Sequence, residues 1–216
     1  MNAIGKKERL RLYLIRHGEV EGAAEGMLLG RTDRPLSERG ISQAHHLADE
    51  LSGAQLTAVY SSDLQRATMT AESIAARHNL QVERHSTWRE IDMGDWEGRS
   101  LAVLYQESPV MVAQVFDDPA SFQYPSGESF SGFITRVQAA LERLLQIHQS
   151  GDIALVAHGG VCRVIIGSAL GIPVGNWLSM AQDYGCLNVI EWFEGRPLLV
   201  SLNYDSSPQT HEEPPL

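Results

Sequence analysis

The amino-acid sequence predicts an α/β fold, a three-layer α/β/α sandwich with a mostly parallel central sheet and an antiparallel C-terminal strand. Short apolar runs rich in strand-forming residues alternate with stretches whose apolar residues recur at helical spacing. This alternation is typical of parallel strands that are joined by helices. Near the end, the runs 187–193 and 198–202 enclose the turn sequence Glu-Gly-Arg-Pro, which predicts a hairpin and hence antiparallel pairing.

Length and composition indicate one globular domain. The chain has 216 residues, of which 43% are hydrophobic and 20% are charged, and these values suit a single core. We therefore expect one domain over residues 1–205. Residues 206–216 contain three of the nine prolines and no apolar pattern, so we expect a disordered tail there.

The first half of the chain predicts three strands and two helices. The expected order is a buried strand over 10–15, a Gly-rich loop over 19–36, a helix from the N-cap Ser37 to about Leu51, a strand over 56–60, a helix from the N-cap Asp63 to about Arg77, a strand over 80–83 and an ordered loop over 88–98. Ser and Asp suit an N-cap because their side-chain oxygens accept an unpaired N–H of the first turn. Ile41, Ala44, Leu47 and Leu51 recur on one face of this helix.

The second half predicts two short helical pieces, two longer helices and the remaining strands. Pro109 divides two helical pieces, and a turn over 124–127 precedes a helix over 129–149. A buried strand over 153–157 then leads into a helix that ends near Leu170. Residues 153–172 have about the length of a membrane span, but they include His158 and Arg163, so we expect a strand and a helix and no membrane contact.

The N-terminus and the cysteines favour a cytoplasmic protein. The apolar run that begins at Leu12 stops at Arg16, which is too short for the core of a signal peptide. Cys162 and Cys186 offer at most one disulfide and no Cys-x-x-Cys pair, as expected in a reducing compartment. We interpret both as small core residues. Neither begins a Cys-x5-Arg motif, which argues against a cysteine phosphatase.

Two histidines follow two of the predicted buried strands. The first strand runs into Arg16-His17-Gly18, and the strand over 153–157 runs into His158-Gly159-Gly160. Ligands of such a sheet bind at the carboxyl ends of the strands, so we expect His17 and His158 to share a site. A lone histidine is more often structural or exposed, and we interpret the other six in that way: His45, His46, His78, His85, His148 and His211.

The neighbours of these two histidines favour phosphate over a metal ion. Histidine is the commonest metal ligand, but the sequence has no His-x-His or His-Glu-x-x-His pair. Arg16 and Arg66, which lies near the start of a predicted helix, would repel a cation and bind an oxyanion. With 17 Lys and Arg against 27 Asp and Glu, the net charge of −10 argues against nucleic acid as a partner. A local basic pocket is compatible with that charge.

A phosphate site that also hydrolyses its ligand needs a nucleophile. The glycines after His158 would let N–H groups at a helix start approach the phosphate. A neutral imidazole can attack phosphorus when a hydrogen bond to its other nitrogen fixes the tautomer. His17 is the candidate for this role, and it would form a phosphohistidine.

Six sequence blocks together carry a family resemblance. They are L-I-R-H-G-E, P-L-S-E-R-G, Y-S-S-D-L-Q-R-A, R-E-I-D-M-G-D-W-E-G, G-E-S and V-A-H-G-G, and they extend from about Leu12 to Gly160. In this order they resemble the histidine phosphatase superfamily, whose other large branch is the cofactor-dependent phosphoglycerate mutases. The resemblance implies that His17 is phosphorylated and that Glu90 protonates the leaving oxygen and later activates water. The phosphoryl oxygens would be held by the remaining site residues: Arg16, Arg66 and His158.

The resemblance also implies substrate contacts, without a metal or a cofactor. Gly159 and Arg31 would bind the substrate, with Arg34 also available. One block departs from the family pattern, because residues 20–24 are Val-Glu-Gly-Ala-Ala where many members have a polar phosphate contact.

Chain length favours a hydrolase over a mutase. Only 67 residues, 91–157, separate Glu90 from His158, and the mutases resembled here have a longer stretch. We expect a phosphomonoester hydrolase for a small phosphorylated metabolite, and the blocks are most similar to α-ribazole phosphatases. A mutase or a non-catalytic phosphate-binding module on this fold is the alternative. Substrate choice would depend on residues that could also be core, namely Val103, Leu104, Tyr105, Phe116 and Phe122. The oligomeric state stays open.

Overall fold

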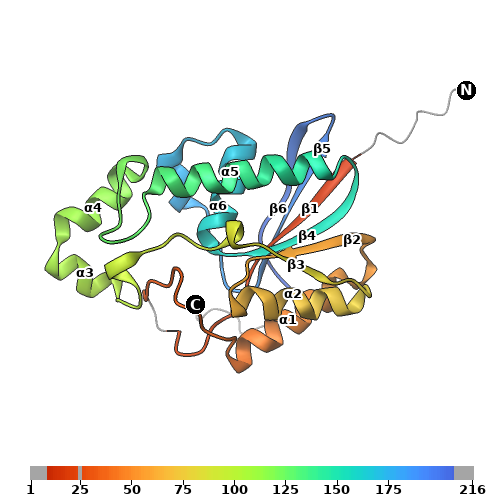
Figure 1. Ribbon diagram of the computed structural model, residues 1–216, viewed down its shortest axis with the longest axis horizontal. Coiled ribbons are helices and arrows are strands. Elements are labelled where there is room, and N and C mark those ends of the chain that lie inside the picture. The colour runs from red at the N-terminus through yellow and green to blue at the C-terminus, as the bar shows by residue number, and fades with distance from the viewer. Residues whose placement is uncertain (1–8, 24–25, 207–216) are drawn as a thin grey trace, which may run out of the picture.

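Six strands form one mixed sheet in the order β3-β2-β4-β1-β5-β6. The computed structural model describes residues 9–23 and 26–206 (Figure 1). The strands are β1 (Arg9–Arg16), β2 (Leu56–Ser61), β3 (Val82–Arg84), β4 (Gly151–Ala157), β5 (Cys186–Phe193) and β6 (Arg196–Asp205). The first four pair in parallel, whereas β5 is antiparallel to β1 and β6 to β5. The predicted fold class and its C-terminal hairpin are confirmed.

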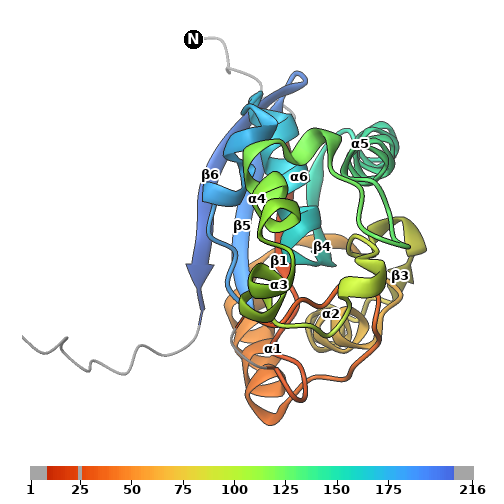
Figure 2. The ribbon, with the colours of Figure 1, turned by 90° about the vertical axis from the view of Figure 1, so that its left-hand side faces the viewer.

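Helices cover both faces of the sheet. One layer contains α1 (Glu38–Glu50) and α2 (Gln65–Arg77), and the other contains α5 (Phe130–Ile147) and α6 (Gly159–Leu170). Two shorter helices, α3 (Leu101–Glu107) and α4 (Pro109–Asp117), form a lobe at one end of the molecule (Figures 1 and 2). Short 3₁₀ helices lie between these elements: η1 (Leu51–Gly53), η2 (Ser86–Trp88), η3 (Gly94–Trp96), η4 (Pro119–Ser121) and η5 (Val174–Ser179). The predicted helix break at Pro109 is confirmed.

Side chains on the two faces of the sheet belong to two separate apolar clusters. Leu12 and Leu14 of β1 pack with residues of α5 and α6, whereas Tyr13 and Ile15 pack with α1 and α2. This alternation follows from the period of two along a strand. Because both faces are covered, residues 12–15 of β1 and 153–157 of β4 are apolar throughout, as is typical of parallel strands.

The pairing of β1 with β4 places the ends of the two strands at the same level. The paired residues end with Arg16 opposite Ala157. The next residue of the first segment, His17, donates its backbone N–H to the carbonyl of Ala157 at 3.0 Å. His17 and His158 therefore leave the sheet side by side.

The start of α1 agrees with the prediction, but its buried face does not agree entirely. Ser37 accepts the N–H of Gly40 at 3.1 Å and caps the helix as expected. Ile41, which the sequence places on one face with Ala44, Leu47 and Leu51, is 39% exposed, whereas those three residues are buried. Gln43 occupies the inner face instead, since its side-chain amide donates to the carbonyl of Tyr184 at 2.9 Å. A polar side chain can be buried there because it is hydrogen-bonded.

The predicted N-cap of α2 is wrong. The carboxylate of Asp63 is held by two hydrogen bonds of 2.7 Å from Arg89, and it makes no cap. The first N–H of the helix, that of Gln65, donates to the carboxylate of Asp33 at 2.8 Å. A carboxylate from the loop over 19–36 thus takes the place of the local one.

The remaining expectations concern membranes, cysteines and the C-terminal tail. No helix among the described residues combines the length and the apolar character needed to cross a membrane. Cys162 and Cys186 are buried and free, as predicted for core residues. Apart from Ser206, the predicted tail lies outside the described residues, so the tail and the domain range 1–205 stay predictions.

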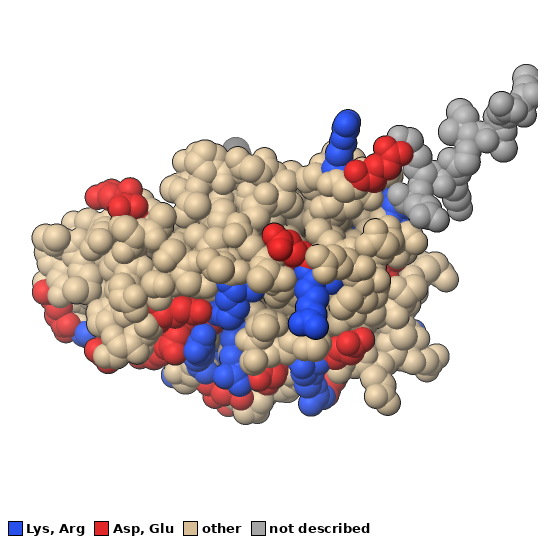
Figure 3. Space-filling view, turned by 45° about the horizontal axis from the view of Figure 1, so that its top comes forward, with Lys and Arg blue, Asp and Glu red and all other residues tan. Residues whose placement is uncertain are grey.

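Basic and acidic side chains are interspersed on the face that Figure 3 shows. Several arginines form ion pairs, among them Arg77 with Asp49 and Arg84 with Glu72. Exposed pairs of this kind contribute little to stability. They do place negative charge beside positive charge, so the arginines on this face form no continuous basic patch.

Close packing of α6 against Trp177 generates a stability prediction. A Cβ at Gly167 would lie 2.1 Å from the indole Nε1, which donates to the carbonyl of Ile172 at 2.8 Å. We expect Gly167→Ala to lower the free energy of unfolding by about 1–3 kcal/mol, as overpacking does. Gly53→Ala is the matched control, because no heavy atom lies within 4 Å of the Cβ it would gain. Urea unfolding that gave both variants equal stability would contradict this account.

Candidate active site

The two strand-end histidines lie in contact with each other. The ring centroids of His17 and His158 are 5.0 Å apart, and the residues are only 3% and 1% exposed. The predicted convergence of these two residues is what the parallel pairing of β1 and β4 produces. His17 lines a cavity, and His158 contacts its ring there, so the hydrogen bonds of both imidazoles decide their chemistry.

The hydrogen bonds of His17 fix its tautomer. Its Nδ1 lies 2.7 Å from the carbonyl oxygen of Gly18, and a carbonyl can only accept, so Nδ1 carries the proton. The other nitrogen, Nε2, receives the Nε–H of Arg66 at 3.2 Å and therefore holds a lone pair. Burial, followed by the charges of Arg66 and Arg16, lowers the pKa of His17 well below 6.5. The ring is thus neutral, as a nucleophile must be.

Arg66 joins the two histidines to the loop over 19–36. Its guanidinium is fully buried, and Nε–H points at His17 Nε2 and also at His158 Nδ1, 3.3 Å away. The terminal nitrogens donate to the carbonyls of Thr32 at 2.8 Å and Gly30 at 2.5 Å. The loop carbonyls therefore determine where the Nε–H of Arg66 points.

Two buried nitrogen atoms in the same place have no hydrogen-bond partner among the described residues. They are Nε of Arg16 and Nε2 of His158. Because His158 Nδ1 accepts from Arg66, its Nε2 carries the proton. Arg16 is held in place by the carbonyl of Gln182 at 2.5 Å and by the ring of Tyr184, 3.9 Å from its guanidinium carbon. Buried donors without partners are costly, and an oxyanion would satisfy both.

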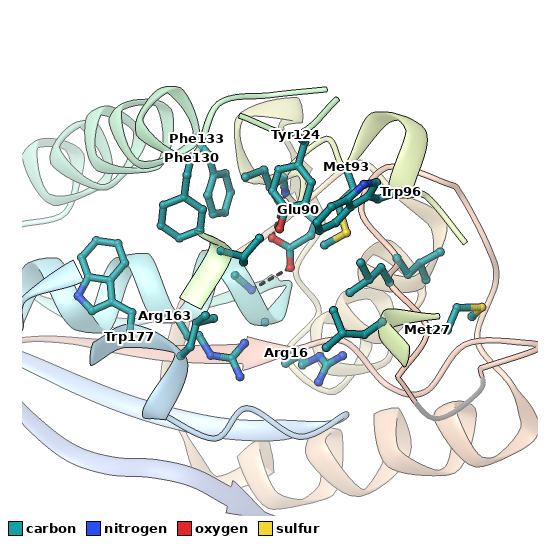
Figure 4. Close-up of a pocket in the computed structure, with 18 of the residues that line it drawn as sticks. Arg16, Met27, Glu90, Met93, Trp96, Tyr124, Phe130, Phe133, Arg163 and Trp177 are labelled. Atoms are coloured by element: carbon teal, nitrogen blue, oxygen red, sulfur yellow. Dashed lines mark hydrogen bonds between the residues drawn. The ribbon is translucent and has the colours of Figure 1, made fainter. Parts of the chain in front are cut away.

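Glu90 lies across the cavity from Arg16 (Figure 4). Its carboxylate accepts the N–H of Gly160 at 2.8 Å and that of Ile91 at 3.0 Å. Gly160 is the second residue of α6, so the carboxylate binds at the positive end of a helix. A Cβ at Gly160 would lie 2.2 Å from Glu90 Oε1, so this approach requires glycine. The sequence assigned the Gly160 N–H to the phosphate, whereas here it binds Glu90.

The cavity beyond Glu90 has a volume of about 280 Å³ and a largely apolar wall. Aromatic side chains from several segments line it: Trp96, Phe116, Tyr124, Phe130, Phe133 and Trp177. Figure 4 shows Trp96, Tyr124, Phe130 and Phe133 around Glu90. Burial, together with the charge of Glu90, raises the pKa of Tyr124, so its hydroxyl stays protonated.

From the sequence, five residues could belong either to the core or to the substrate pocket, and the structure divides them into three groups. Phe116 lines the cavity. Leu104 and Phe122 are buried in the core, whereas Val103 and Tyr105 are 44% and 59% exposed. The lobe of α3 and α4 therefore supplies one of these side chains to the cavity wall.

The two candidate substrate contacts in the sequence differ in their placement. Gly159, the first residue of α6, lines the cavity. The guanidinium of Arg31 instead pairs with Asp92 and Glu128, each at 3.2 Å. Arg34 donates to backbone carbonyls of its own loop. A role for Arg31 in substrate binding stays a prediction.

Two cavity residues were not found from the sequence. Arg163, on the first turns of α6, donates from Nε to the carbonyl of Met180 at 2.9 Å and lines the cavity. Tyr184 packs on both Arg16 and the ring of His17. Arg163 had a usable signal, since it lies one and a half turns after His158 on the helix that begins there. Tyr184 had none, because it reaches the site through a long irregular segment.

The chain is similar to known proteins over most of its length. The family model described as "Histidine phosphatase superfamily (branch 1)" matches residues 12–205. Phosphoserine phosphatase 1 of Hydrogenobacter thermophilus is 32% identical over 194 residues, which cover 90% of this chain and 92% of that protein. The protein named Probable phosphoglycerate mutase GpmB of Proteus mirabilis is 34% identical over 164 residues, 76% of each chain. The solved α-ribazole phosphatase from Shigella flexneri has a TM-score of 0.81 at 31% identity, over 90% of this chain and 96% of that one.

The lowered pKa values of the two site histidines generate a prediction. Burial, the charge of Arg66 and then that of His17 lower the pKa of His158 well below 6.5, as burial and Arg66 do for His17. We expect both imidazoles to stay neutral in the folded protein as the pH falls through 6.5, as measured by ¹⁵N NMR. Because the unfolded chain takes up these protons at higher pH, the folded state loses stability as the pH falls below 6.5. Midpoints at or above 6.5 for both rings would contradict the assignment.

Proposed function

Because the chain belongs to the histidine phosphatase superfamily, branch 1, and is a phosphatase, we propose that it hydrolyses a phosphomonoester in two steps through a phosphohistidine at His17. One observation carries this proposal. The Nδ1–H of His17 is bound by the Gly18 carbonyl, so the Nε2 lone pair faces the group of cationic and N–H donors around Arg66. That arrangement presents a nucleophile to a bound phosphate.

In the first step, the phosphoryl group binds among the unpaired donors. Its oxygens accept from Arg16 Nε, His158 Nε2 and Arg66, which offset the charge that develops on phosphorus oxygens. As the Nε–H of Arg66 moves from His17 Nε2 to a phosphoryl oxygen, the freed lone pair of Nε2 forms the N–P bond while the bond from phosphorus to the leaving oxygen breaks. That oxygen takes a proton from the protonated carboxyl of Glu90. The alcohol leaves, and the phosphoryl group stays on His17.

In the second step, water replaces the alcohol. The carboxylate of Glu90 takes a proton from the water as its oxygen bonds to phosphorus and the N–P bond breaks. Inorganic phosphate then leaves, and both His17 and Glu90 return to their starting forms. Since Arg16 and Arg66 supply positive charge, we propose that neither step needs a metal ion or a cofactor.

The cavity wall supports a substrate with an apolar or aromatic alcohol part. Side chains such as Trp96 and Phe130 can contact an organic group while the phosphate binds at His17. α-Ribazole 5′-phosphate, a small metabolite that contains an aromatic ring system, is the specific candidate that we propose. We also propose a cytoplasmic location, because both cysteines are free and buried.

A phosphoglycerate mutase is the second candidate. It is supported by the similarity to the GpmB protein of Proteus mirabilis. The 67 residues of 91–157 and the apolar wall favour hydrolysis, because a mutase must retain its phosphoryl group for a small, highly charged acceptor. A purely phosphate-binding module would need no carboxyl opposite the nucleophile, so Glu90 argues against it.

The phosphohistidine is tested by trapping it. After incubation with a ³²P-labelled phosphomonoester in the presence of EDTA, we expect a phosphoryl label that is acid-labile and base-stable. The label should be lost in His17→Ala and kept in His148→Ala, the control, since His148 binds Tyr60 outside the cavity. Full labelling and activity of His17→Ala would refute the nucleophile. Efficient bisphosphoglycerate-dependent exchange between 3- and 2-phosphoglycerate would favour the mutase.

The role of Glu90 is tested with two leaving groups. An alkyl phosphate needs a proton on its leaving oxygen, whereas a nitrophenolate can leave unaided. We expect Glu90→Gln to slow phosphorylation by the alkyl phosphate about 10²–10⁴-fold, the usual range for general acid catalysis, and phosphorylation by nitrophenyl phosphate much less. Single-turnover kinetics isolate this step from water activation. Equal losses would mean that Glu90 positions the phosphate and that another group is the acid.

A further inference from the structure

The carboxylate of Glu97 binds a row of backbone N–H groups next to the active site. It accepts from Gly30 at 3.1 Å, Arg31 at 2.6 Å and Thr32 at 3.2 Å. Three successive peptide groups thus point their N–H bonds at one charge, which makes strong, charge-assisted hydrogen bonds. Glu97 lies outside the cavity lining, and the two-step reaction above does not use it.

The same segment of the loop binds Arg66 through its carbonyl groups. Arg66 donates to the carbonyl of Thr32 at 2.8 Å and to that of Gly30 at 2.5 Å. Residues 30–32 therefore lie between a carboxylate and a guanidinium, with N–H groups toward the first and carbonyls toward the second. In this orientation the peptide dipoles are favourable to both charges. The negative charge of Glu97 also opposes the lowering of the Arg66 pKa that burial causes.

The approach of Glu97 to the loop depends on glycine. A Cβ at Gly30 would lie 2.4 Å from Glu97 Oε1 and 2.3 Å from the carbonyl oxygen of Ile91. Neither atom is the far end of a side chain that is free to move, since Glu97 is held by three N–H groups and Ile91 contributes backbone. The carboxylate can therefore approach the loop this closely only because residue 30 has no side chain.

The loop is also fixed to the helix that carries Arg66. Asp33, the residue after the bound segment, accepts from the backbone N–H of Gln65 at 2.8 Å and from its side-chain amide at 3.2 Å. Gln65 and Arg66 are the first two residues of α2. The loop thus holds both the backbone and the guanidinium of the helix start, while Glu97 holds the loop from its other side.

We infer that Glu97 is a positioning residue for phosphoryl transfer, which holds residues 30–32 so that their carbonyls keep the guanidinium of Arg66 beside His17 and His158, where the phosphoryl group binds. This inference rests on the proposed role of Arg66 in binding the phosphoryl group. Glu97 lies outside the cavity lining; it also accepts the N–H of Met93 at 3.4 Å, and it acts on Arg66 through the loop peptides. Small displacements of a group that binds the reacting phosphate are costly, because a shift of about 1 Å can reduce a rate 10²-fold.

The test is a double-mutant cycle on kcat/KM for nitrophenyl phosphate. We expect Glu97→Gln to reduce kcat/KM about 10- to 100-fold, because an amide cannot accept from all three N–H groups and its own NH₂ faces one of them. In an Arg66→Lys background the same change should cost less than about 3-fold, since coupled residues are not additive. A lysine cannot bind both carbonyls and the imidazoles at once. In that background the loop therefore no longer positions a guanidinium beside the histidines.

The matched control is Glu191→Gln. Glu191 is a buried carboxylate that is likewise held by hydrogen bonds, in its case from Nε of Arg11 at 2.7 Å. It belongs to β5, opposite Arg11 of β1, and does not line the cavity. We expect this change to lower the thermal stability while kcat/KM stays within about 2-fold of the wild type. The affinity for inorganic phosphate, measured by calorimetry, should fall in Glu97→Gln and not in Glu191→Gln.

The outcomes distinguish a failure of the proposed role of Arg66 from a failure of the inference about Glu97. If Arg66→Lys alone leaves kcat/KM unchanged, the proposed role of Arg66 fails. If Arg66→Lys is impaired but Glu97→Gln costs equally in both backgrounds, only the inference about Glu97 is wrong, and the loop acts independently of Arg66. Should Glu97→Gln not fold, Glu97→Asp keeps the charge, reaches fewer N–H groups and goes through the same cycle with the same criterion.

Discussion

The site depends on a buried guanidinium that has no ion-pair partner among the described residues. Arg66 is fully buried, and taking a charge out of water without compensation is expensive. Its compensation comes from neutral acceptors, namely two loop carbonyls and two imidazoles. Arg66 can therefore be buried only if the loop over 19–36 holds its carbonyls in place and both histidines stay neutral. A phosphate that enters this place supplies the missing negative charge.

Several features of the site follow from this buried, unpaired positive charge. Burial, followed by the charges of Arg66 and Arg16, lowers the pKa of His17, so this imidazole keeps its lone pair. Buried donors on Arg16 and His158 have no hydrogen-bond partner among the described residues. An oxyanion that binds beside them would accept hydrogen bonds from both. Glu90, the carboxyl nearest to the phosphate site, is held by backbone N–H groups of α6 and its own loop, and it does not neutralise Arg66 directly.

Sequence patterns predicted the parts of the molecule that follow from strand and helix periodicity. His17 and His158 were placed together because two apolar runs end in them and parallel strands end at one edge. Asp33 as the cap of α2 and Gln43 on the inner face of α1 could not be predicted, because their partners lie far away in the sequence. The role of Glu97 also depends on contacts across more than sixty positions, although its motif was part of the family resemblance. Local signals specify elements, while long loops set the contacts between them.

The position of β1 in the sheet has a consequence for how the protein is made. This strand comes first in the described chain, yet its two neighbours in the sheet are β4 and β5, which a ribosome synthesises near the end. Until β4 and β5 are made, the apolar strand β1 has no partner in the sheet, and unpaired strands of this kind are prone to aggregation. Pairing across so long a stretch also slows folding. His17 can meet His158 only after most of the chain exists, so an incomplete chain has no nucleophile in place and catalytic activity marks a finished protein.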